Sequence, residues 1–231
     1  MRFTFFEDFL ALVFPKTCCV CKRSLFDFEK QLCKVCIGSL PVTNYHLNPQ
    51  NNDLVIKVMG LTKPNLVMSY LRFTKRGTSQ KLLHSLKYRN KPEIGIELGT
   101  LYGYLLKNNG FEFNWDMVVP VPLHPEKQRR RSYNQSEQFA IGIASVLGIP
   151  MQLGLVRTQF TETQTKKSRM ERINNVSEVF AINKNVKVEG VKILLVDDVM
   201  TTGATLTSCA NVLLESNAVL VDLAVIAAGK F

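Results

Sequence analysis

The stretch that decides the fold is VKILLVDDVMTTGATL, residues 191–206. Its run Ile193–Val196 is continuously apolar, as expected for a strand buried on both faces of a parallel sheet. Two carboxylates follow the run, and Thr201–Thr205 (TTGAT) then leads into a predicted helix from Gly203 to about Ser216. A buried strand that passes through a short polar loop into a helix is the repeating unit of an α/β protein with a parallel sheet.

The same stretch carries chemistry. Ligands of open α/β sheets bind beyond the carboxyl ends of strands, and a helix N-terminus there offers free N–H groups to a phosphate. Threonine hydroxyls add donors, glycine lets the backbone approach closely, and two adjacent carboxylates can hold a vicinal diol or a divalent metal. Phosphate beside a diol describes a ribose 5-phosphate, although a threonine-capped helix start is the ordinary alternative. The candidate binding residues are Asp197, Asp198, Thr201, Thr202, Gly203, Ala204 and Thr205.

Strand and helix patterns alternate along the rest of the chain and predict a three-layer α/β fold. The long apolar run Val219–Ala227 resembles a second strand buried on both faces. The sequence shows no internal repeat. The other expected strands are 66–73, 116–121, 151–156, 178–182 and 191–196, and the other expected helices are 78–87, 93–106 and 135–147.

The N-terminal region differs in composition, because five of the six cysteines lie between residues 18 and 36. Two CxxC pairs separated by eleven residues predict a structural Zn²⁺ site with ligands Cys18, Cys21, Cys33 and Cys36. Two disulfides are the alternative, and Cys19 is an alternative ligand to Cys18. The predicted domains are residues 1–45, an N-terminal helix with a four-cysteine zinc module, and residues 46–231, the α/β domain.

The composition narrows the class of protein further. The 231 residues are 46% hydrophobic, which excludes a disordered chain, and 29 Lys+Arg against 19 Asp+Glu give a net charge of +10. Such a charge favours an anionic partner. No run is long and apolar enough for a membrane span, so a cytoplasmic protein is expected.

Residues 193–205 resemble the thirteen-residue phosphoribosyl pyrophosphate motif of type I phosphoribosyltransferases. Three further features make the chain as a whole resemble the ComF family of competence-associated, phosphoribosyltransferase-like proteins. They are the four-cysteine knuckle, VPVPLHPEKQRRRSYNQ (119–135) and RTQFTETQTKKSRMERINNV (157–176).

The resemblance implies roles for two more segments. Residues 119–135 resemble a pyrophosphate loop, for which Arg suits the bidentate geometry of phosphate oxygens, and residues 157–176 resemble a flexible loop that closes over the ligand. The family commonly has Arg-Gly-Phe-Asn where this chain has RSYN, and Ser132 lacks the freedom of glycine at positive φ. The implied pyrophosphate-loop residues are Arg129, Arg130, Arg131 and Asn134, and the implied flexible-loop residues are Gln164, Lys167, Arg169 and Arg172.

A second basic segment lies outside this predicted ligand site. Residues 54–92 contain no Asp or Glu, and Tyr70, Phe73 and Tyr88 are interleaved with their cations. Aromatic stacking with phosphate neutralisation would suit single-stranded DNA, whereas a solvated helix face with core aromatics is the alternative. The candidate DNA-binding residues are Arg72, Lys75, Arg76, Lys81, Lys87 and Arg89.

Two functions remain open. The resemblance implies a phosphoribosyl pyrophosphate-binding protein of natural competence that uses Mg²⁺ and handles incoming single-stranded DNA, with a competence helicase or DNA-uptake proteins as partners. The other is an active, amidophosphoribosyltransferase-like enzyme without a glutaminase domain that transfers ribose 5-phosphate to an amine or base.

Overall fold

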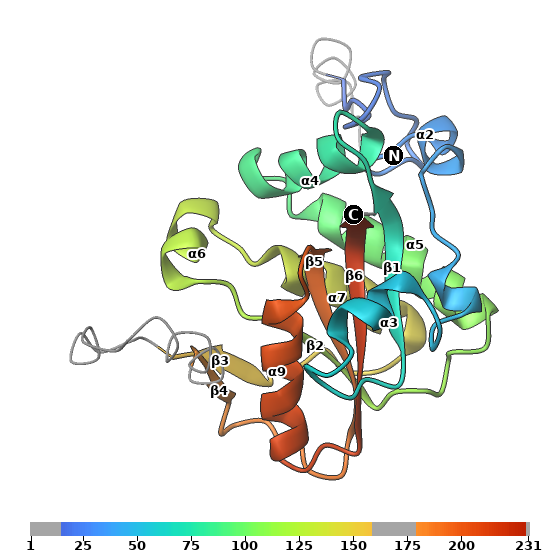
Figure 1. The fold of residues 1–231 in the computed structure, drawn as a ribbon. Helices are drawn as coiled ribbons and strands as arrows, with labels where there is room; N and C mark the ends of the chain where they lie inside the picture. Colours follow the sequence, from blue (N-terminus) through green and yellow to red (C-terminus); the bar gives the residue numbers. More distant parts are fainter. Residues whose placement is uncertain (1–14, 159–178, 230–231) are drawn as a thin grey trace.

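The computed structural model describes residues 15–158 and 179–229 and contains a four-stranded parallel sheet (Figure 1). The strand order is β1-β6-β5-β2, so the strand of the deciding stretch, β5, lies in the interior of the sheet. All three strand pairs are parallel, as the continuous apolar runs predict. The strands are β1 (Val67–Phe73), β2 (Met117–Pro120), β5 (Lys192–Met200) and β6 (Leu220–Gly229).

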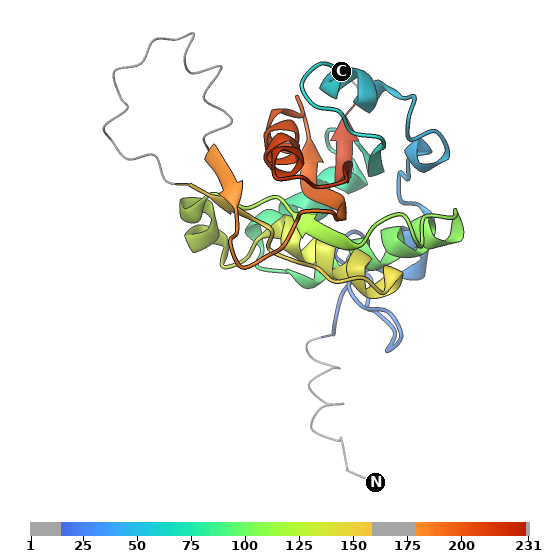
Figure 2. The same ribbon diagram turned by 90° about the horizontal axis from the view of Figure 1, so that it is seen from below.

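Helices cover both faces of this sheet and confirm the three-layer prediction (Figure 2). Because side chains alternate along a strand, Leu194 and Val196 of β5 pack in one core with α4, α5 and α7. Ile193 and Leu195 pack in the other core with α3 and α9. The helices are α3 (Asp53–Val58), α4 (Thr78–Tyr88), α5 (Glu93–Asn108), α7 (Gln135–Leu147) and α9 (Ala204–Glu215).

Helices α5 and α7 cross in close contact because glycines lie at the crossing. A Cβ atom on Gly142 would collide with the carbonyl oxygen of Ile96, and one on Gly99 would collide with the carbonyl oxygen of Phe139. The backbones of the two helices therefore touch, and larger residues at these positions would separate them. This contact fixes the position of α7, which begins beside the candidate site.

Strand β5 is longer than the apolar run predicts. The sequence places its end at Val196, but the strand continues through Asp197 and Asp198 to Met200, which pairs with Ala228 of β6. Its other neighbour, β2, stops at Pro120 opposite Val196. The prediction of a strand end at Val196 is wrong because pairing with β6 extends the strand past the point where side chains become polar.

Three smaller elements also differ from expectation. The strands β3 (Leu155–Arg157) and β4 (Phe180–Ile182) form a separate antiparallel pair rather than part of the main sheet. Met151, where a strand was expected to begin, makes only an isolated bridge to Val118. A helix α6 (Pro125–Arg131), capped by the side chain of His124, occupies the basic segment that we expected to be loop.

The cysteine-rich module packs directly on the α/β domain. It contains α2 (Lys34–Gly38) and is followed by the 3₁₀ helix η1 (Tyr45–Leu47). Leu32 and Leu40 join the same hydrophobic core as α5 and α7, and the N–H of Gln31 donates a 2.7 Å hydrogen bond to Glu97 on α5. The domain boundary at residue 45 stays a prediction, and the predicted helix within residues 1–14 lies outside the described residues.

Within residues 15–158 and 179–229, no helix combines the length and apolar character needed to cross a membrane.

Candidate functional site

The candidate site lies at the carboxyl end of β2, beside the last residues of β5. The chain that leaves β2 returns through α7 on one face of the sheet, whereas the chain that leaves β5 returns through α9 on the opposite face. Neighbouring strands whose connections diverge in this way open a crevice at their carboxyl ends, the usual ligand position in such sheets. The segments 121–135 and 200–204 border this crevice.

Asp197 lies at the centre of this edge and is held by two hydrogen bonds. The Ser136 hydroxyl on α7 donates to its Oδ1 atom at 2.8 Å, and the N–H of Asp198 donates to the same atom at 2.8 Å. Burial and the negative charge of Asp198 outweigh these bonds and raise the pKa of Asp197 to about 7. A carboxyl group with such a pKa is found more often at functional sites than elsewhere.

Asp198 forms an ion pair with Lys87 at the end of α4. The Lys87 Nζ atom lies 2.9 Å from Asp198 Oδ2, and both side chains are largely buried. The sequence predicts that Lys87 belongs to a separate DNA-binding surface, and this stays a prediction. In the structure its ammonium group lies beside the two aspartates.

The loop between β5 and α9 has the geometry of an anion cradle. Gly203 is the N-cap residue of α9 with φ +83°, a conformation that L side chains rarely adopt. A Cβ atom on Gly203 would also lie only 3.0 Å from Met200 Cε and 3.1 Å from Val58 Cγ1. Thr201 and Thr202 are exposed beside it, and residues 199–206 with Asp197 line a small cavity of about 40 Å³.

A larger basic cavity adjoins the aspartates. Its volume is about 590 Å³, and Lys87 lines it as well as contacting Asp198. The Tyr133 hydroxyl donates to the carbonyl oxygen of Leu86, and the Arg131 guanidinium lies 5.3 Å from the centre of the Tyr88 ring. These contacts tie the segment after β2 to the end of α4. Lys87, Tyr88, Asn90, Lys127, Arg130, Arg131 and Ser132 line the cavity.

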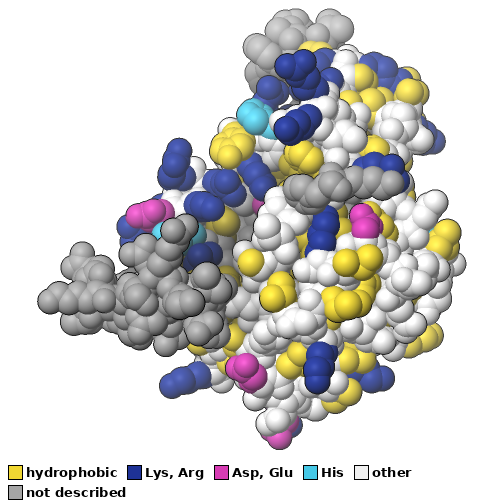
Figure 3. Space-filling model, viewed as in Figure 1, with side chains coloured by type: hydrophobic (Ala, Val, Ile, Leu, Met, Phe, Trp, Pro, Cys, Tyr) yellow, Lys and Arg dark blue, Asp and Glu magenta, His cyan; other side chains and the backbone are white. Residues whose placement is uncertain are grey.

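The three arginines predicted for a pyrophosphate loop line two different cavities among the described residues. Arg130 and Arg131 line the basic cavity, whereas Arg129 lines a second cavity of about 380 Å³ with His124 and Arg157. The helix α6 causes this division, because successive residues on a helix point in different directions. Figure 3 shows Lys and Arg side chains gathered around α6 and the hollow beside it.

Ser132 and Asn134 have structural roles in this segment. Ser132 ends α6 at φ +66°, so it adopts the left-handed conformation that favours the glycine of the family pattern. The buried Asn134 side chain accepts a hydrogen bond from the N–H of Ser136 and donates one to the carbonyl oxygen of Val121. Asn134 therefore caps α7 and fixes the loop rather than offering its amide to a ligand.

Four predicted residues of the flexible loop cannot be placed. Gln164, Lys167, Arg169 and Arg172 lie outside the described residues.

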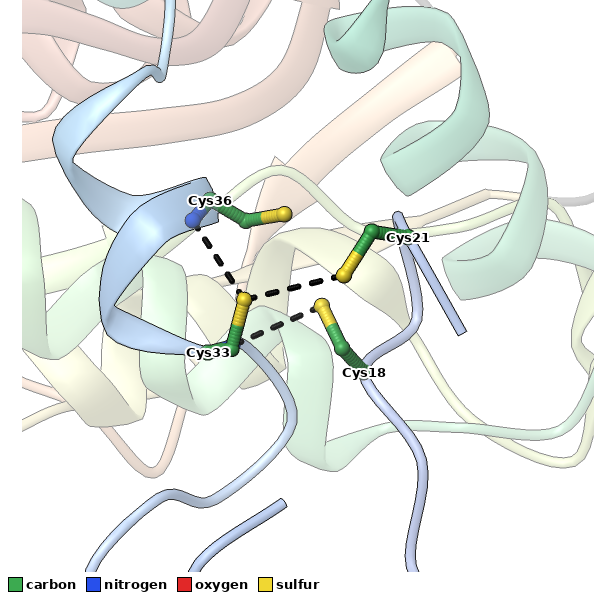
Figure 4. Close-up of side chains that lie close together, drawn as sticks. All are labelled: Cys18, Cys21, Cys33 and Cys36. Atoms are coloured by element: carbon green, nitrogen blue, oxygen red, sulfur yellow. Dashed lines mark hydrogen bonds between the residues drawn. The ribbon is translucent and has the colours of Figure 1, made fainter. Parts of the chain in front are cut away.

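The four cysteines predicted as metal ligands come together in one cluster (Figure 4). The sulfur atoms of Cys18, Cys21, Cys33 and Cys36 all lie within 4.8 Å of one another, and those of Cys21 and Cys33 are 3.7 Å apart. A tetrahedral zinc ion with Zn–S bonds of about 2.3 Å requires sulfur separations of about 3.8 Å. The cluster can therefore hold a metal ion such as zinc. None of the six cysteines, all of which lie within the described residues, forms a disulfide.

The thiols around this cluster differ in their pKa. Burial raises the pKa of Cys18, but hydrogen bonds from the backbone of Cys21, Cys33 and Val20 outweigh burial and lower it to about 6. Burial, with the nearby charge of Cys18, raises the pKa of Cys19 to about 12. Burial and hydrogen bonds from the other thiols also raise the pKa of Cys36, so the pKa does not separate ligands from non-ligands. Cys19 is set apart by its position, because it is not part of the four-cysteine cluster.

The basic segment 54–92 presents its cations but not the expected aromatic rings. Tyr70 is buried against Tyr102 and cannot stack on a base, and Phe73 packs partly buried on the hydrophobic core. Tyr88 is exposed, but it lines the basic cavity. The candidate DNA-binding residues other than Lys87 are exposed: Arg72, Lys75, Arg76, Lys81 and Arg89.

Sequence reasoning missed two contributors to the site. Ser136 holds Asp197, and Asn90 lines the basic cavity. Ser136 follows the Asn134 cap by two residues, and a serine in a first helical turn is ordinarily part of the capping pattern. Only the packing of α7 against β5 shows that its hydroxyl meets a carboxylate.

Comparisons with known proteins identify relatives of this chain. The phosphoribosyl transferase domain matches residues 85–230. Competence protein ComFC of Bacillus subtilis (strain 168) is 28% identical over 210 residues, which cover 87% of this chain and 78% of that protein. DNA utilization protein YhgH of Escherichia coli (strain K12) is 28% identical over 226 residues, which cover 93% of this chain and 91% of that protein.

Solved structures show a more distant likeness. Glutamine phosphoribosylpyrophosphate amidotransferase from B. subtilis is 24% identical, with a TM-score of 0.44 over 62% of this chain. The match spans only 30% of that structure's chain. The fold assignment therefore depends on the domain match and on the parallel sheet described above.

The fold and the matched domain define a protein with the type I phosphoribosyltransferase fold. This chain belongs to the phosphoribosyl transferase domain family and, with relatives named as competence and DNA utilization proteins, to its ComF branch.

Proposed function

We propose that this protein binds phosphoribosyl pyrophosphate with Mg²⁺ in the crevice between β2 and β5 and handles incoming single-stranded DNA in the cytoplasm of competent cells. The observation that carries the first part is the arrangement of Asp197, Asp198 and the Thr201–Thr205 loop around one sheet edge beside a basic cavity. In this arrangement, the aspartates contact the ribose hydroxyls and the loop contacts the 5-phosphate.

Each part of the proposed site has chemistry that suits one group of the ligand. The N-terminus of the twelve-residue helix α9 attracts a phosphate dianion through free N–H groups and the helix dipole. The cations Lys87, Arg130 and Arg131 suit a pyrophosphate group. Mg²⁺ prefers carboxylate and phosphate oxygens, so Asp197, Asp198 and the ligand itself would hold it between them.

Lys87 has a specific part in this proposal. Its ammonium group lies 2.9 Å from the Asp198 carboxylate and neutralises it, so a cation is already present beside the proposed ligand site. Ligand and Mg²⁺ binding would release Lys87 from Asp198 and let it turn toward the pyrophosphate in the basic cavity that it lines. Lys87 would therefore contribute to affinity without contacting the ribose.

The cysteine cluster is proposed to hold a structural Zn²⁺ ion. Four thiolates with sulfur spacings near those of a tetrahedron form a closed site, in which no position is left for a catalytic water. A module of this size gains its folding free energy from such a metal.

The DNA-handling part of the proposal has separate support. Curated relatives are named as competence and DNA utilization proteins, the chain carries a net charge of +10, and Lys75, Arg76, Lys81 and Arg89 are exposed. Association with the helicase or DNA-uptake proteins of the competence machinery would place the protein where single strands enter. Cytoplasmic localisation belongs to the same proposal.

Isothermal titration with phosphoribosyl pyrophosphate and Mg²⁺ tests the ligand site. We expect binding by the zinc-loaded protein and no detectable heat from the Asp197→Asn/Asp198→Asn variant. Asp27→Asn, which removes an exposed carboxylate from the cysteine module, is the matched control and should bind normally. Equal binding by the double variant would contradict the proposed site, and no binding by the natural protein would contradict the proposed ligand.

Active transfer of ribose 5-phosphate is a second candidate function. The volume of the basic cavity, about 590 Å³, favours it because that space exceeds the need of a pyrophosphate group and would admit an acceptor beside the ribose. Release of pyrophosphate in the presence of candidate amines and bases tests this function. Release that requires one acceptor and disappears in Asp197→Asn would support it.

A further inference from the structure

Two phenylalanines at the tip of the cysteine module are exposed and stacked on each other. Phe26 and Phe28 are 59% and 64% exposed, their ring centroids are 5.6 Å apart, and the angle between the rings is 16°. Exposing two neighbouring aromatic rings forgoes a considerable burial free energy. They lie in the loop between the two CxxC pairs, whereas the proposed ribose-phosphate site is built from β5, α9 and the segment after β2.

A buried carboxylate holds this loop in place. Glu29 is only 7% exposed, and it accepts hydrogen bonds from the N–H of Phe26 at 3.0 Å and the N–H of Lys34 at 2.8 Å. Arg23 completes the arrangement with a 2.7 Å ion pair to the same carboxylate. The rings are therefore presented on a backbone that is tied to both halves of the cysteine cluster.

Cations lie against both rings. The Arg23 guanidinium carbon is 5.2 Å from the Phe26 centroid, and Lys34 Nζ is 4.6 Å from the Phe28 centroid. Residues 15–38 carry five Lys or Arg against Asp27 and Glu29, a formal charge of +3 that a Zn²⁺ ion held by four thiolates would reduce to +1. Two exposed aromatic rings with a cation at each are complementary to unpaired bases linked by phosphates.

We propose that Phe26 and Phe28 form a stacking platform for the bases of single-stranded DNA, with Lys34 and Arg23 contacting the adjoining phosphates. The proposal rests on the DNA-handling part of the proposed function and assigns it a site. Stacking of a base on an exposed ring is stronger than the exposed contact of a lysine with that ring, so a base displaces Lys34 toward the phosphate. Glu29 keeps Arg23 close by throughout.

The platform supplies what the basic segment 54–92 lacks. That segment has exposed cations, but Tyr70 is buried, Phe73 is partly buried on the core, and the exposed Tyr88 lines the basic cavity. The cysteine module joins the same core as α4 and α5, which places the platform and the basic segment on one rigid body. A strand bound by both would use the module for its bases and the segment for its phosphates.

Fluorescence anisotropy with a labelled oligothymidylate of about 20 nucleotides tests the platform. We expect Phe26→Ala/Phe28→Ala to weaken binding about 10- to 100-fold, with an unchanged dependence on salt because stacking releases no counterions. Phe26→Leu/Phe28→Leu keeps the apolar surface but removes the rings, so it should lose nearly as much affinity. Phe113→Ala, which removes a ring that is 87% exposed on the α5–β2 connection, should bind as the natural protein does.

Four outcomes would overturn the inference, and they are distinguishable. Affinity retained by Phe26→Ala/Phe28→Ala refutes the platform alone and leaves the proposed DNA handling intact. No binding of the oligonucleotide by the natural protein refutes both. DNA binding restored in Phe26→Leu/Phe28→Leu would identify an apolar docking contact instead. Loss of binding to phosphatidylglycerol vesicles by Phe26→Ala/Phe28→Ala, without loss of DNA binding, would identify a membrane contact instead.

Two controls keep the result interpretable. Zinc content and thermal unfolding show whether each variant retains the folded cysteine module. Titration with phosphoribosyl pyrophosphate should be unchanged in all the phenylalanine variants, because the rings lie outside the proposed ligand site.

Discussion

Replacing Asp197 by asparagine should make the protein more stable while it destroys the proposed ligand site. The asparagine side chain keeps an oxygen that can accept from the Ser136 hydroxyl and the N–H of Asp198, as Asp197 does at 2.8 Å. What the substitution removes is a negative charge that burial and Asp198 make unfavourable. A rise of the pKa from 3.8 to about 7 corresponds to about 4 kcal/mol, which is the upper limit of the effect.

The sign of the pH dependence follows from the raised pKa. The folded protein holds a proton on Asp197 up to a pH of about 7, whereas the unfolded chain releases it near pH 4. The stability that this proton contributes is therefore present at low pH and is lost as the pH rises through about 7. Between pH 5 and pH 8 the natural protein should lose about 2 to 3 kcal/mol from this group, and the variant should not.

Urea unfolding of both proteins at pH 5 and pH 8, with Mg²⁺ removed, measures this difference. We expect the advantage of Asp197→Asn to grow with pH, and its melting temperature at pH 8 to rise by about 5 °C or more. Asp27→Asn serves as a control for removal of an exposed carboxylate. A variant less stable than the natural protein at pH 8, or an advantage that shrinks as the pH rises, would refute the reasoning.

Three further predictions concern other parts of the molecule. Ser132→Gly should stabilise the protein by about 1 kcal/mol in thermal unfolding, because Ser132 has φ +66°; a lower melting temperature would contradict this. Gly142→Ala should destabilise it by about 1 to 3 kcal/mol despite alanine's higher helix propensity, because the methyl group meets Ile96, and unchanged stability would show that α5 and α7 can separate freely. Cys36→Ser should lose bound zinc and most of the module's protection from proteolysis, whereas Cys19→Ser should keep its zinc; zinc content by atomic absorption decides between them.

Much of the fold follows from local pattern. Residues 135–147 are predicted and observed as one helix, and the apolar runs near Val196 and Val221 are predicted and observed as parallel strands. Both types of element depend on the periodicity of apolar side chains, which is a property of the chain itself. The same is true of the two CxxC pairs, whose spacing brings four thiols together in the structure.

The details of the site depend on contacts between distant segments. Lys87 is 111 residues from Asp198 in the chain, and nothing local distinguishes it from the other cations of segment 54–92. The separation of Arg129 from Arg130 and Arg131 required a helix that the basic run did not predict. The burial of Tyr70 and the partial burial of Phe73 follow from packing on the hydrophobic core, which no local pattern shows.

The sequence by itself thus determined the four strands of the main sheet, the helices α4, α5, α7 and α9, the polar loop after β5 and the cysteine cluster. Each of these depends on residues that are close together in the chain or on a repeating pattern, for which local sterics and hydrophobic burial suffice. Only the tertiary structure decided which cation neutralises Asp198, which hydroxyl holds Asp197 and which aromatic rings face water. Those outcomes depend on long-range packing of α4 and α7 against β5, and such packing is a property of the whole hydrophobic core.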